Sequence, residues 1–287
     1  MLTSELRAAS FRASALTTTI RRRELFIWVA AILAATHFFR IDAHSVTHLP
    51  EALVQAFTSR SVFHYLGWYA VFQLLADSNR SAPASLTDIA FGLFAALLPF
   101  FPVHSLAWIS TTALGGYLLV TSRDDSKVGA AAIVLLALAF NGLWAPQFFD
   151  IFAFQLLRAD TAIVGALLSL TQAGITWHST IIASDIHSIV ILAQCSSFHN
   201  ISLGLLCWVA LTKLARTSWA RGDILVALLV CVTVLFLNTI RLYYMALSPE
   251  QYAYWHTGFG AQLFAGTTPA AIIAISLWGA YRSGRPT

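Results

Sequence analysis

Long apolar runs separated by short polar connections are the feature that most limits how this sequence can fold. A hydrocarbon core of about 30 Å requires about 20 helical residues, or slightly fewer when flanking side chains snorkel to the interface. Only 10% of the 287 residues are charged, whereas soluble domains contain about 25% charged residues. The chain is therefore expected to be an integral membrane protein.

Eight segments meet this criterion, so we predict an all-α fold with about eight transmembrane helices. They cover approximately residues 25–39, 62–76, 89–103, 105–121, 129–145, 199–214, 224–247 and 261–281. Residues 148–170 are also apolar, but they include Asp150, Gln155, Arg158 and Asp160. We expect this segment to lie at the outer interface or to form a re-entrant element.

The basic residues predict the orientation of these helices. With a cytoplasmic N-terminus, eight helices leave all but four of the 17 Lys and Arg residues in cytoplasmic segments; the exceptions are Arg40, Arg60, Arg158 and Arg241. This bias follows the positive-inside rule. Both termini are therefore expected in the cytoplasm of a multi-pass protein of the plasma (inner) membrane. The basic residues form short clusters between apolar runs, so no nucleic-acid partner is predicted.

Residues 193–200 bring a thiol, hydroxyls, an imidazole and an amide together in an otherwise apolar chain. Ser196 is able to cap the helix that follows Cys195. The thiol would then lie at the positive end of the helix dipole, which favours the nucleophilic thiolate. The alternative is a packing cysteine followed by capping serines. Cys207 and Cys231 fall inside apolar runs, and no CxxC pattern or disulfide framework is present.

A second polar point is formed by Asn238 and Arg241, in a segment that is otherwise largely apolar. Their i, i+3 spacing places them on one helix face. From there they could present donors to a carbonyl oxygen that becomes negative in a tetrahedral intermediate. The alternative is an arginine that snorkels to lipid phosphate.

A third polar point is His256, in an aromatic stretch flanked by glycines at residues 253–260. A neutral imidazole can accept a thiol proton and return it to a leaving amine. A histidine beside Trp and Tyr is also typical of a membrane interface. His199, four residues after Cys195, is a competing base on what could be the same helical face, and the spacing does not choose between the two. More distant candidates are His178 and His187.

Other catalytic chemistries lack their usual patterns. The histidines contain no HExxH spacing for zinc, and no GxSxG nucleophile elbow occurs. The carboxylates Asp150, Asp160 and Asp185 form no recognisable acid pair. No metal or other cofactor is predicted.

The order of Cys195, Asn238-x-x-Arg241 and His256 followed by Gly258 resembles the exosortase/archaeosortase family. The resemblance covers approximately residues 159–287, and the earlier segments match only in hydrophobicity. It implies a multispanning cysteine transpeptidase in which Cys195 is the nucleophile and Arg241 and His256 are the other catalytic residues. Asn238 matches the asparagine that commonly precedes this arginine.

One departure from the family concerns the residues after the nucleophile. The family usually has Cys-Ser-Gly, whereas this chain has Cys195-Ser196-Ser197. This difference suggests a divergent subfamily. Glycine supplies backbone freedom and no chemistry, so the nucleophile assignment is unaffected.

The resemblance also implies a substrate and a domain organisation. We expect a protease or transpeptidase that cleaves the C-terminal sorting tail of secreted proteins at the extracytoplasmic face and transfers the new C-terminus to an unspecified acceptor. Asn238 and Ser196 would support catalysis, and membrane lipid would surround the protein. Residues 1–24 would form a basic cytoplasmic tail, 25–145 a five-helix region and 146–287 the catalytic region. A transporter or envelope-assembly factor with a polar substrate path is the alternative.

Overall fold

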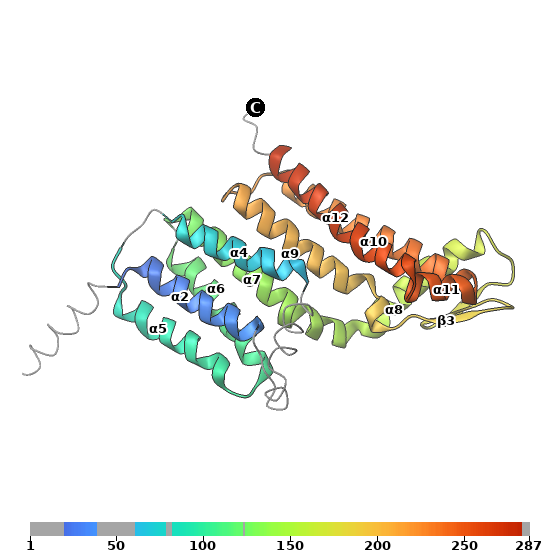
Figure 1. Cartoon of the computed structure of the whole chain (residues 1–287), viewed down its shortest axis with the longest axis horizontal. Helices are drawn as coiled ribbons and strands as arrows, with labels where there is room; N and C mark the ends of the chain where they lie inside the picture. Colours follow the sequence, from blue (N-terminus) through green and yellow to red (C-terminus); the bar gives the residue numbers. More distant parts are fainter. Residues whose placement is uncertain (1–19, 39–60, 79–81, 123, 283–287) are drawn as a thin grey trace, which may run out of the picture. The chain divides into compact units, whose positions relative to one another are not determined.

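The computed structural model describes residues 20–38, 61–78, 82–122 and 124–282, which are mostly helical (Figure 1). The chain divides into two compact units, Met1–Leu143 and Trp144–Thr287. The helical class predicted from the apolar runs is confirmed, and a helix lies at each of the eight predicted positions. Most of the predicted basic tail, with Arg7 and Arg12, and the predicted last residue of the first helix, Phe39, lie outside the described residues.

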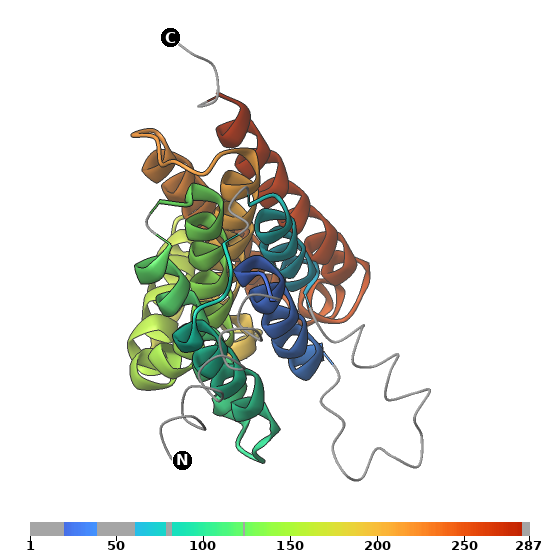
Figure 2. The ribbon, with the colours of Figure 1, turned by 90° about the vertical axis from the view of Figure 1, so that its left-hand side faces the viewer.

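The first unit is a bundle of short helices. They are α2 (Arg22–Phe38), α4 (Val62–Ala76), α5 (Leu86–Leu97) with the 3₁₀ turn Leu98–Phe100, α6 (His104–Thr121) and α7 (Ser126–Ala139). Helix α2 lies between α4 and α5 (Figures 1 and 2). Helix α5 begins at a reciprocal capping box between Ser85 and Asp88. This cap explains why the helix starts before the apolar run.

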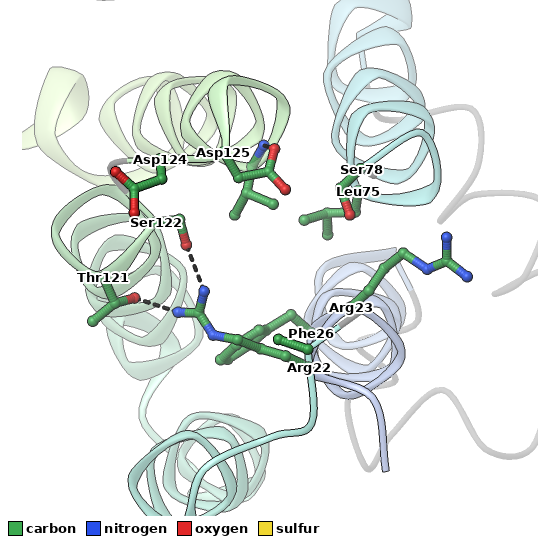
Figure 3. A pocket seen from close by; sticks show the side chains of 11 residues that line it. Arg22, Arg23, Phe26, Leu75, Ser78, Thr121, Ser122, Asp124 and Asp125 are labelled. Carbon is green, nitrogen blue, oxygen red and sulfur yellow. Dashed lines mark hydrogen bonds between the residues drawn. The ribbon is translucent and has the colours of Figure 1, made fainter. Parts of the chain in front are cut away.

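Polar side chains join helix ends in the first unit. The Nε atom of Arg22 donates to Asp88 Oδ1 (2.9 Å), and its terminal nitrogens donate to Ser122 Oγ (2.9 Å) and to Thr121. The Tyr117 hydroxyl also donates to Asp88 Oδ1 (2.8 Å). Figure 3 shows Arg22 and its two hydroxyl partners at the edge of a cavity of about 130 Å³. A charged residue at the start of an apolar helix is thus neutralised by a carboxylate of the same unit.

The second unit contains the later helices. They are α8 (Ala145–Ser169), α9 (Ser197–Ala215), α10 (Asp223–Leu247), α11 (Pro249–His256) and α12 (Phe259–Arg282), and the π-helical turn Phe140–Trp144 precedes α8. Helices α9, α10 and α12 run side by side, each in contact with the other two (Figure 1). The short helix α11 connects α10 to α12 and contacts both of them.

A small antiparallel sheet lies between α8 and α9 in the sequence. Its strands are β1 (Thr176–His178), β2 (Ile181–Ala183) and β3 (Ser188–Val190), in the order β1-β2-β3. His178 pairs with Ile181 across a two-residue turn that contains Ser179 at φ 58°. The sequence interpretation contained no strand, because three-residue strands are too short for an alternating pattern to stand out.

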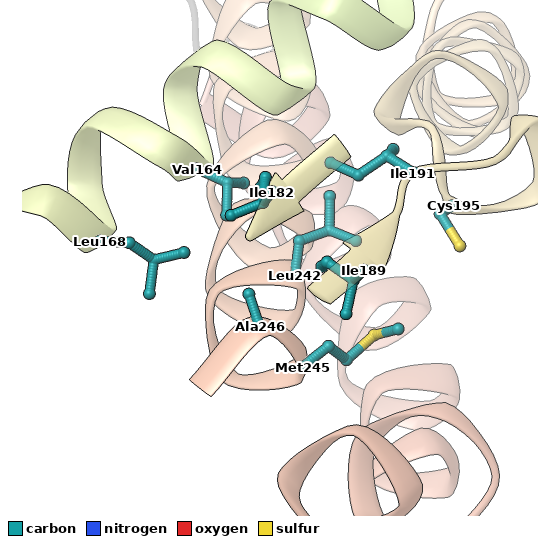
Figure 4. Packing of buried hydrophobic residues seen from close by; sticks show 9 residues of the cluster. All are labelled: Val164, Leu168, Ile182, Ile189, Ile191, Cys195, Leu242, Met245 and Ala246. Atoms are coloured by element: carbon teal, nitrogen blue, oxygen red, sulfur yellow. The ribbon is translucent and has the colours of Figure 1, made fainter. Parts of the chain in front are cut away.

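The sheet packs on α8 and α10 through a buried aliphatic cluster (Figure 4). Helix α8 contributes Val164 and Leu168, the sheet and the chain after it contribute three isoleucines, and α10 contributes its last turns. The full set is Val164, Leu168, Ile182, Ile189, Ile191, Cys195, Leu242, Met245 and Ala246. Cys195 lies at one edge of the cluster in Figure 4. The sheet therefore covers the end of α10 next to the candidate nucleophile.

Four helical stretches of the described residues are long and apolar enough to cross a membrane: Ser126–Ser169, Ser197–Ala215, Asp223–Leu247 and Phe259–Arg282. The first has 44 residues. At 1.5 Å per residue it is about twice as long as a hydrocarbon core of about 30 Å. Its α8 part, which includes most of the predicted interfacial or re-entrant segment 148–170, is one uninterrupted helix.

Candidate active site

Cys195 is the last residue of a 3₁₀ turn, Ala193–Cys195, and it is 7% exposed. Ser196 has an extended backbone and caps α9, accepting a hydrogen bond from the backbone N–H of Phe198 (3.3 Å). Helix α9 therefore begins at Ser197, after the cysteine. The expected helical i, i+4 relation between Cys195 and His199 is wrong, because Cys195 is outside the helix.

A chain of buried hydrogen bonds holds the backbone around Cys195. Asn238 Nδ2, on α10, donates to the Cys195 carbonyl oxygen (2.9 Å) and to Ser197 Oγ (3.0 Å). Ser197 in turn donates to Asp160 on α8, from Oγ to Oδ1 (3.0 Å) and from its backbone N–H to Oδ2 (3.1 Å). Side chains from α8, α9 and α10 thus form one hydrogen-bonded chain that ends at the Cys195 carbonyl oxygen. We call Asp160, Ser197 and Asn238 the Cys195 clamp.

The clamp changes the expected role of Asn238. Its amide nitrogen already donates to two acceptors, so Asn238 has no free donor for an oxyanion. Its Oδ1 atom is buried and has no hydrogen bond within the described part of the chain. The sequence correctly predicted that Asn238 lies close to Cys195. In the structure, however, its amide group holds the backbone carbonyl of Cys195 and the hydroxyl of Ser197.

The clamp also occupies the start of α9. The first free N–H groups of a helix are the ones that would stabilise a thiolate nearby. Here the N–H of Ser197 bonds to Asp160 and the N–H of Phe198 bonds to Ser196. Two of the N–H groups at the start of α9 are therefore already bonded to acceptors other than Cys195.

Arg241 lies one turn after Asn238 on α10, and residues at this spacing have Cβ atoms about 5–6 Å apart. Its Nε atom donates to the carbonyl oxygen of Trp255 on α11 (3.2 Å). Its guanidinium carbon lies 4.9 Å from the ring centre of Phe264 on α12. Its terminal nitrogens form no hydrogen bond with any described residue, so they remain available as donors.

Helix α11 is capped by Ser248, whose Oγ accepts from the backbone N–H of Gln251 (3.2 Å), and Pro249 is its first residue. The same hydroxyl donates to the carboxylate of Glu250 (2.7 Å), and this bond lowers the pKa of Glu250 below its ordinary value. The Ser248 cap and the proline together define the N-terminus of a helix of only eight residues. His256 is its last residue.

The imidazole of His256 is stacked on Tyr252, with ring centres 4.9 Å apart and planes at 13°. Neither ring nitrogen of His256 forms a hydrogen bond within the described part of the chain. His187 also lies near Tyr252: the two ring centres are 5.9 Å apart, and the Nε2 atom of His187 is buried without a described partner. His187 therefore lies closer to the site than its sequence position suggested, since the sheet folds it onto α11.

His199 lies in a different environment. It lines a cavity of about 350 Å³ together with Phe149, Phe198 and Gln194. Cys195, in contrast, belongs to the cluster formed with the end of α10, and Trp255 next to His256 packs against that cluster. The fold therefore associates Cys195 with the helix that carries His256.

The structure thus brings the predicted residues to one end of the second unit. Asn238 bonds to Cys195, Arg241 follows one helical turn later, and Arg241 bonds to the residue before His256. The sequence analysis missed Asp160 and Ser197 as partners of the site. A carboxylate in an apolar segment was the available signal for Asp160, because buried carboxylates need donors. Among the described residues, no group of three or more His, Cys, Asp or Glu is arranged to hold a metal ion.

A protein-family model described as transmembrane exosortase (Exosortase_EpsH) matches residues 56–273, which is more than half of the chain. Neither a curated protein nor a solved structure matches it. The matched range includes every residue of the site described above, and the match indicates a transpeptidase-like function in general terms. The apolar helices agree with a multi-pass membrane protein. The chain therefore belongs to the transmembrane exosortase family.

Proposed function

We propose that this protein is a membrane-embedded cysteine peptidase and transpeptidase that acts on the C-terminal sorting tails of secreted proteins. The substrate would be a short motif followed by an apolar helix and a basic tail. The observation that carries the proposal is the pair of hydrogen bonds that links Cys195 to Asn238 and Arg241 to Trp255. The first ties the backbone of Cys195 to α10, which also carries Arg241, and the second ties Arg241 to the residue before His256.

In the proposed reaction, His256 accepts the thiol proton and the Cys195 sulfur forms a bond to the carbonyl carbon of the scissile peptide. The carbonyl oxygen becomes negative and accepts hydrogen bonds from the terminal nitrogens of Arg241. The intermediate collapses, the C–N bond breaks, and His256 returns the proton to the leaving amine. An acceptor amine or water then attacks the thioester and restores the thiol.

The proposed orientation follows the charge bias of the sequence. The protein would lie in the plasma (inner) membrane with eight transmembrane helices, both termini in the cytoplasm and the site at the extracytoplasmic face. Ile186 is 75% exposed in the turn between β2 and β3. In an Ile186→Cys variant, a membrane-impermeant maleimide should label this position in intact spheroplasts. Labelling only after permeabilisation would reverse the orientation.

The nucleophile assignment is tested with full-length protein in lipid nanodiscs and a fusion substrate that ends in a sorting tail from the same organism. Cys195→Ala should abolish cleavage. Cys207→Ala is the matched control, because Cys207 is a fully buried thiol on α9 and plays no part in the proposed mechanism. Equal cleavage by wild-type protein and Cys195→Ala would disprove the assignment.

A further inference from the structure

We propose that Asp160 is a positioning residue for Cys195 and that Ser197 is required in this protein because it connects the two. The name positioning residue rests on the proposed function, since it presumes that Cys195 is the nucleophile. Asp160 does not contact the cysteine itself. It acts through Ser197 and Asn238, which are the other members of the Cys195 clamp.

The clamp is fully enclosed. Asp160 is 7% exposed, Ser197 3% and Asn238 1%. Breaking a hydrogen bond in such a place leaves an unsatisfied polar group out of contact with water, which costs more than losing an exposed bond. The four bonds also join segments that are far apart in the sequence, on α8, at the start of α9 and on α10. They are therefore tertiary contacts and not local turns. The clamp therefore fixes the cysteine backbone relative to α8 and α10.

Both oxygens of Asp160 and the amide nitrogen of Asn238 take part in the clamp. The two carboxylate oxygens of Asp160 accept from two different groups of Ser197, the N–H and the hydroxyl. An asparagine at position 160 has one acceptor oxygen only, so it can keep one of these bonds but not both. The Ser197 hydroxyl donates to Asp160 and accepts from Asn238, so its loss disconnects α8 from α10 at this point.

The Ser197 side chain can be tested by replacing it with glycine, which keeps the backbone N–H and removes the hydroxyl. If that position needed only backbone freedom, then Ser197→Gly would be harmless. The clamp predicts the opposite, because glycine keeps the N–H bond to Asp160 but removes the hydroxyl bridge to Asn238. Ser197→Gly should therefore impair this protein.

The test measures the position of Cys195 independently of catalysis. Full-length protein in nanodiscs is alkylated with iodoacetamide, and the rates at Cys195 and Cys207 are obtained by peptide mass spectrometry. Cys207 reports global opening, because it is 0% exposed and lies on α9 away from the clamp. The variants are Asp160→Asn, Ser197→Gly and Ser197→Thr. Threonine keeps the hydroxyl and serves as the conservative control.

In Asp160→Asn and Ser197→Gly, the rate at Cys195 relative to Cys207 should rise by about tenfold, because a buried bond that resists local opening is lost. Ser197→Thr should stay within about twofold of wild type. Turnover of the fusion substrate in the first two variants should fall by about 10²-fold with little change in KM, as expected for a misplaced reacting group.

Two results would overturn the proposal. In one, the ratio stays at the wild-type value in both Asp160→Asn and Ser197→Gly. In the other, Cys195 and Cys207 gain reactivity together, which would make the clamp a general stabilising contact. A wild-type protein that cleaves no tail would refute the proposed function, but the labelling ratio would still decide whether the clamp holds Cys195.

Discussion

At the scale of single residues, the sequence allows either His199 or His256 to accept the Cys195 proton. The backbone conformation at Cys195 distinguishes the two histidines. Cys195 precedes the cap of α9, so it shares no helical face with His199. His199 lines a cavity with Phe149 and Phe198, whereas Trp255 beside His256 packs against the cluster that contains Cys195. On the proposed mechanism, we therefore assign the base to His256.

We predict that His256→Ala lowers kcat for tail cleavage by about 10²–10⁴-fold, which is the usual contribution of a positioned general base. His199→Ala should retain most of the wild-type rate, because this imidazole lines a cavity with Phe149 and Phe198 and does not belong to the cluster that contains Cys195. The measurement is single-turnover cleavage of the fusion substrate in nanodiscs. If His256→Ala retained turnover while His199→Ala lost it, then His199 would be the general base and His256 would not.

At the scale of elements, the turn between α11 and α12 fixes the end of the helix that carries His256. The backbone N–H of Gly258 bonds to the carbonyl oxygen of Ala253 (3.0 Å) and closes α11. A Cβ atom on Gly258 would lie 2.9 Å from the carbonyl oxygen of Tyr254, which is backbone and cannot rotate away. A side chain at this position must therefore displace the end of α11.

We predict that Gly258→Ala destabilises the protein by about 1–3 kcal/mol, the range for overpacking a tight site, and reduces cleavage. Gly266→Ala is the control, because a Cβ atom there meets nothing within 4 Å and α12 gains helix propensity. Thermal unfolding of the two variants in the same nanodiscs provides the comparison. A Gly258→Ala variant as stable and active as Gly266→Ala would contradict the role of this turn.

Helix positions were predictable because hydropathy reports which segments are apolar, but their ends were not. Helix α4 covers the predicted residues 62–76, whereas α2 begins before the predicted residue 25. The early start includes Arg22, which hydropathy excludes but which Asp88 neutralises in the folded unit. Helix ends depend on such caps and ion pairs, and these come from partners distant in sequence.

At the scale of the whole molecule, the sequence predicted a polar site made from late helices, and the structure brings Cys195, Asn238, Arg241 and His256 to one end of the second unit. The sequence did not predict the Cys195 clamp, because Asp160 lies 37 positions before Ser197 and no local pattern joins them. The sheet was missed for the same reason, since its short strands gain stability only from packing on α8 and α10. Contacts of this kind depend on the folded chain.

The central claim is that Cys195 forms a covalent acyl intermediate with a sorting tail. The direct measurement is rapid acid quenching of full-length protein with the fusion substrate during turnover, followed by intact-mass and peptide mass spectrometry. We predict an adduct on Cys195 with the mass of the N-terminal cleavage product, joined by a hydroxylamine-sensitive thioester. Cleavage that proceeds with no such adduct, or with an adduct on Cys207 or Cys231, would contradict the account.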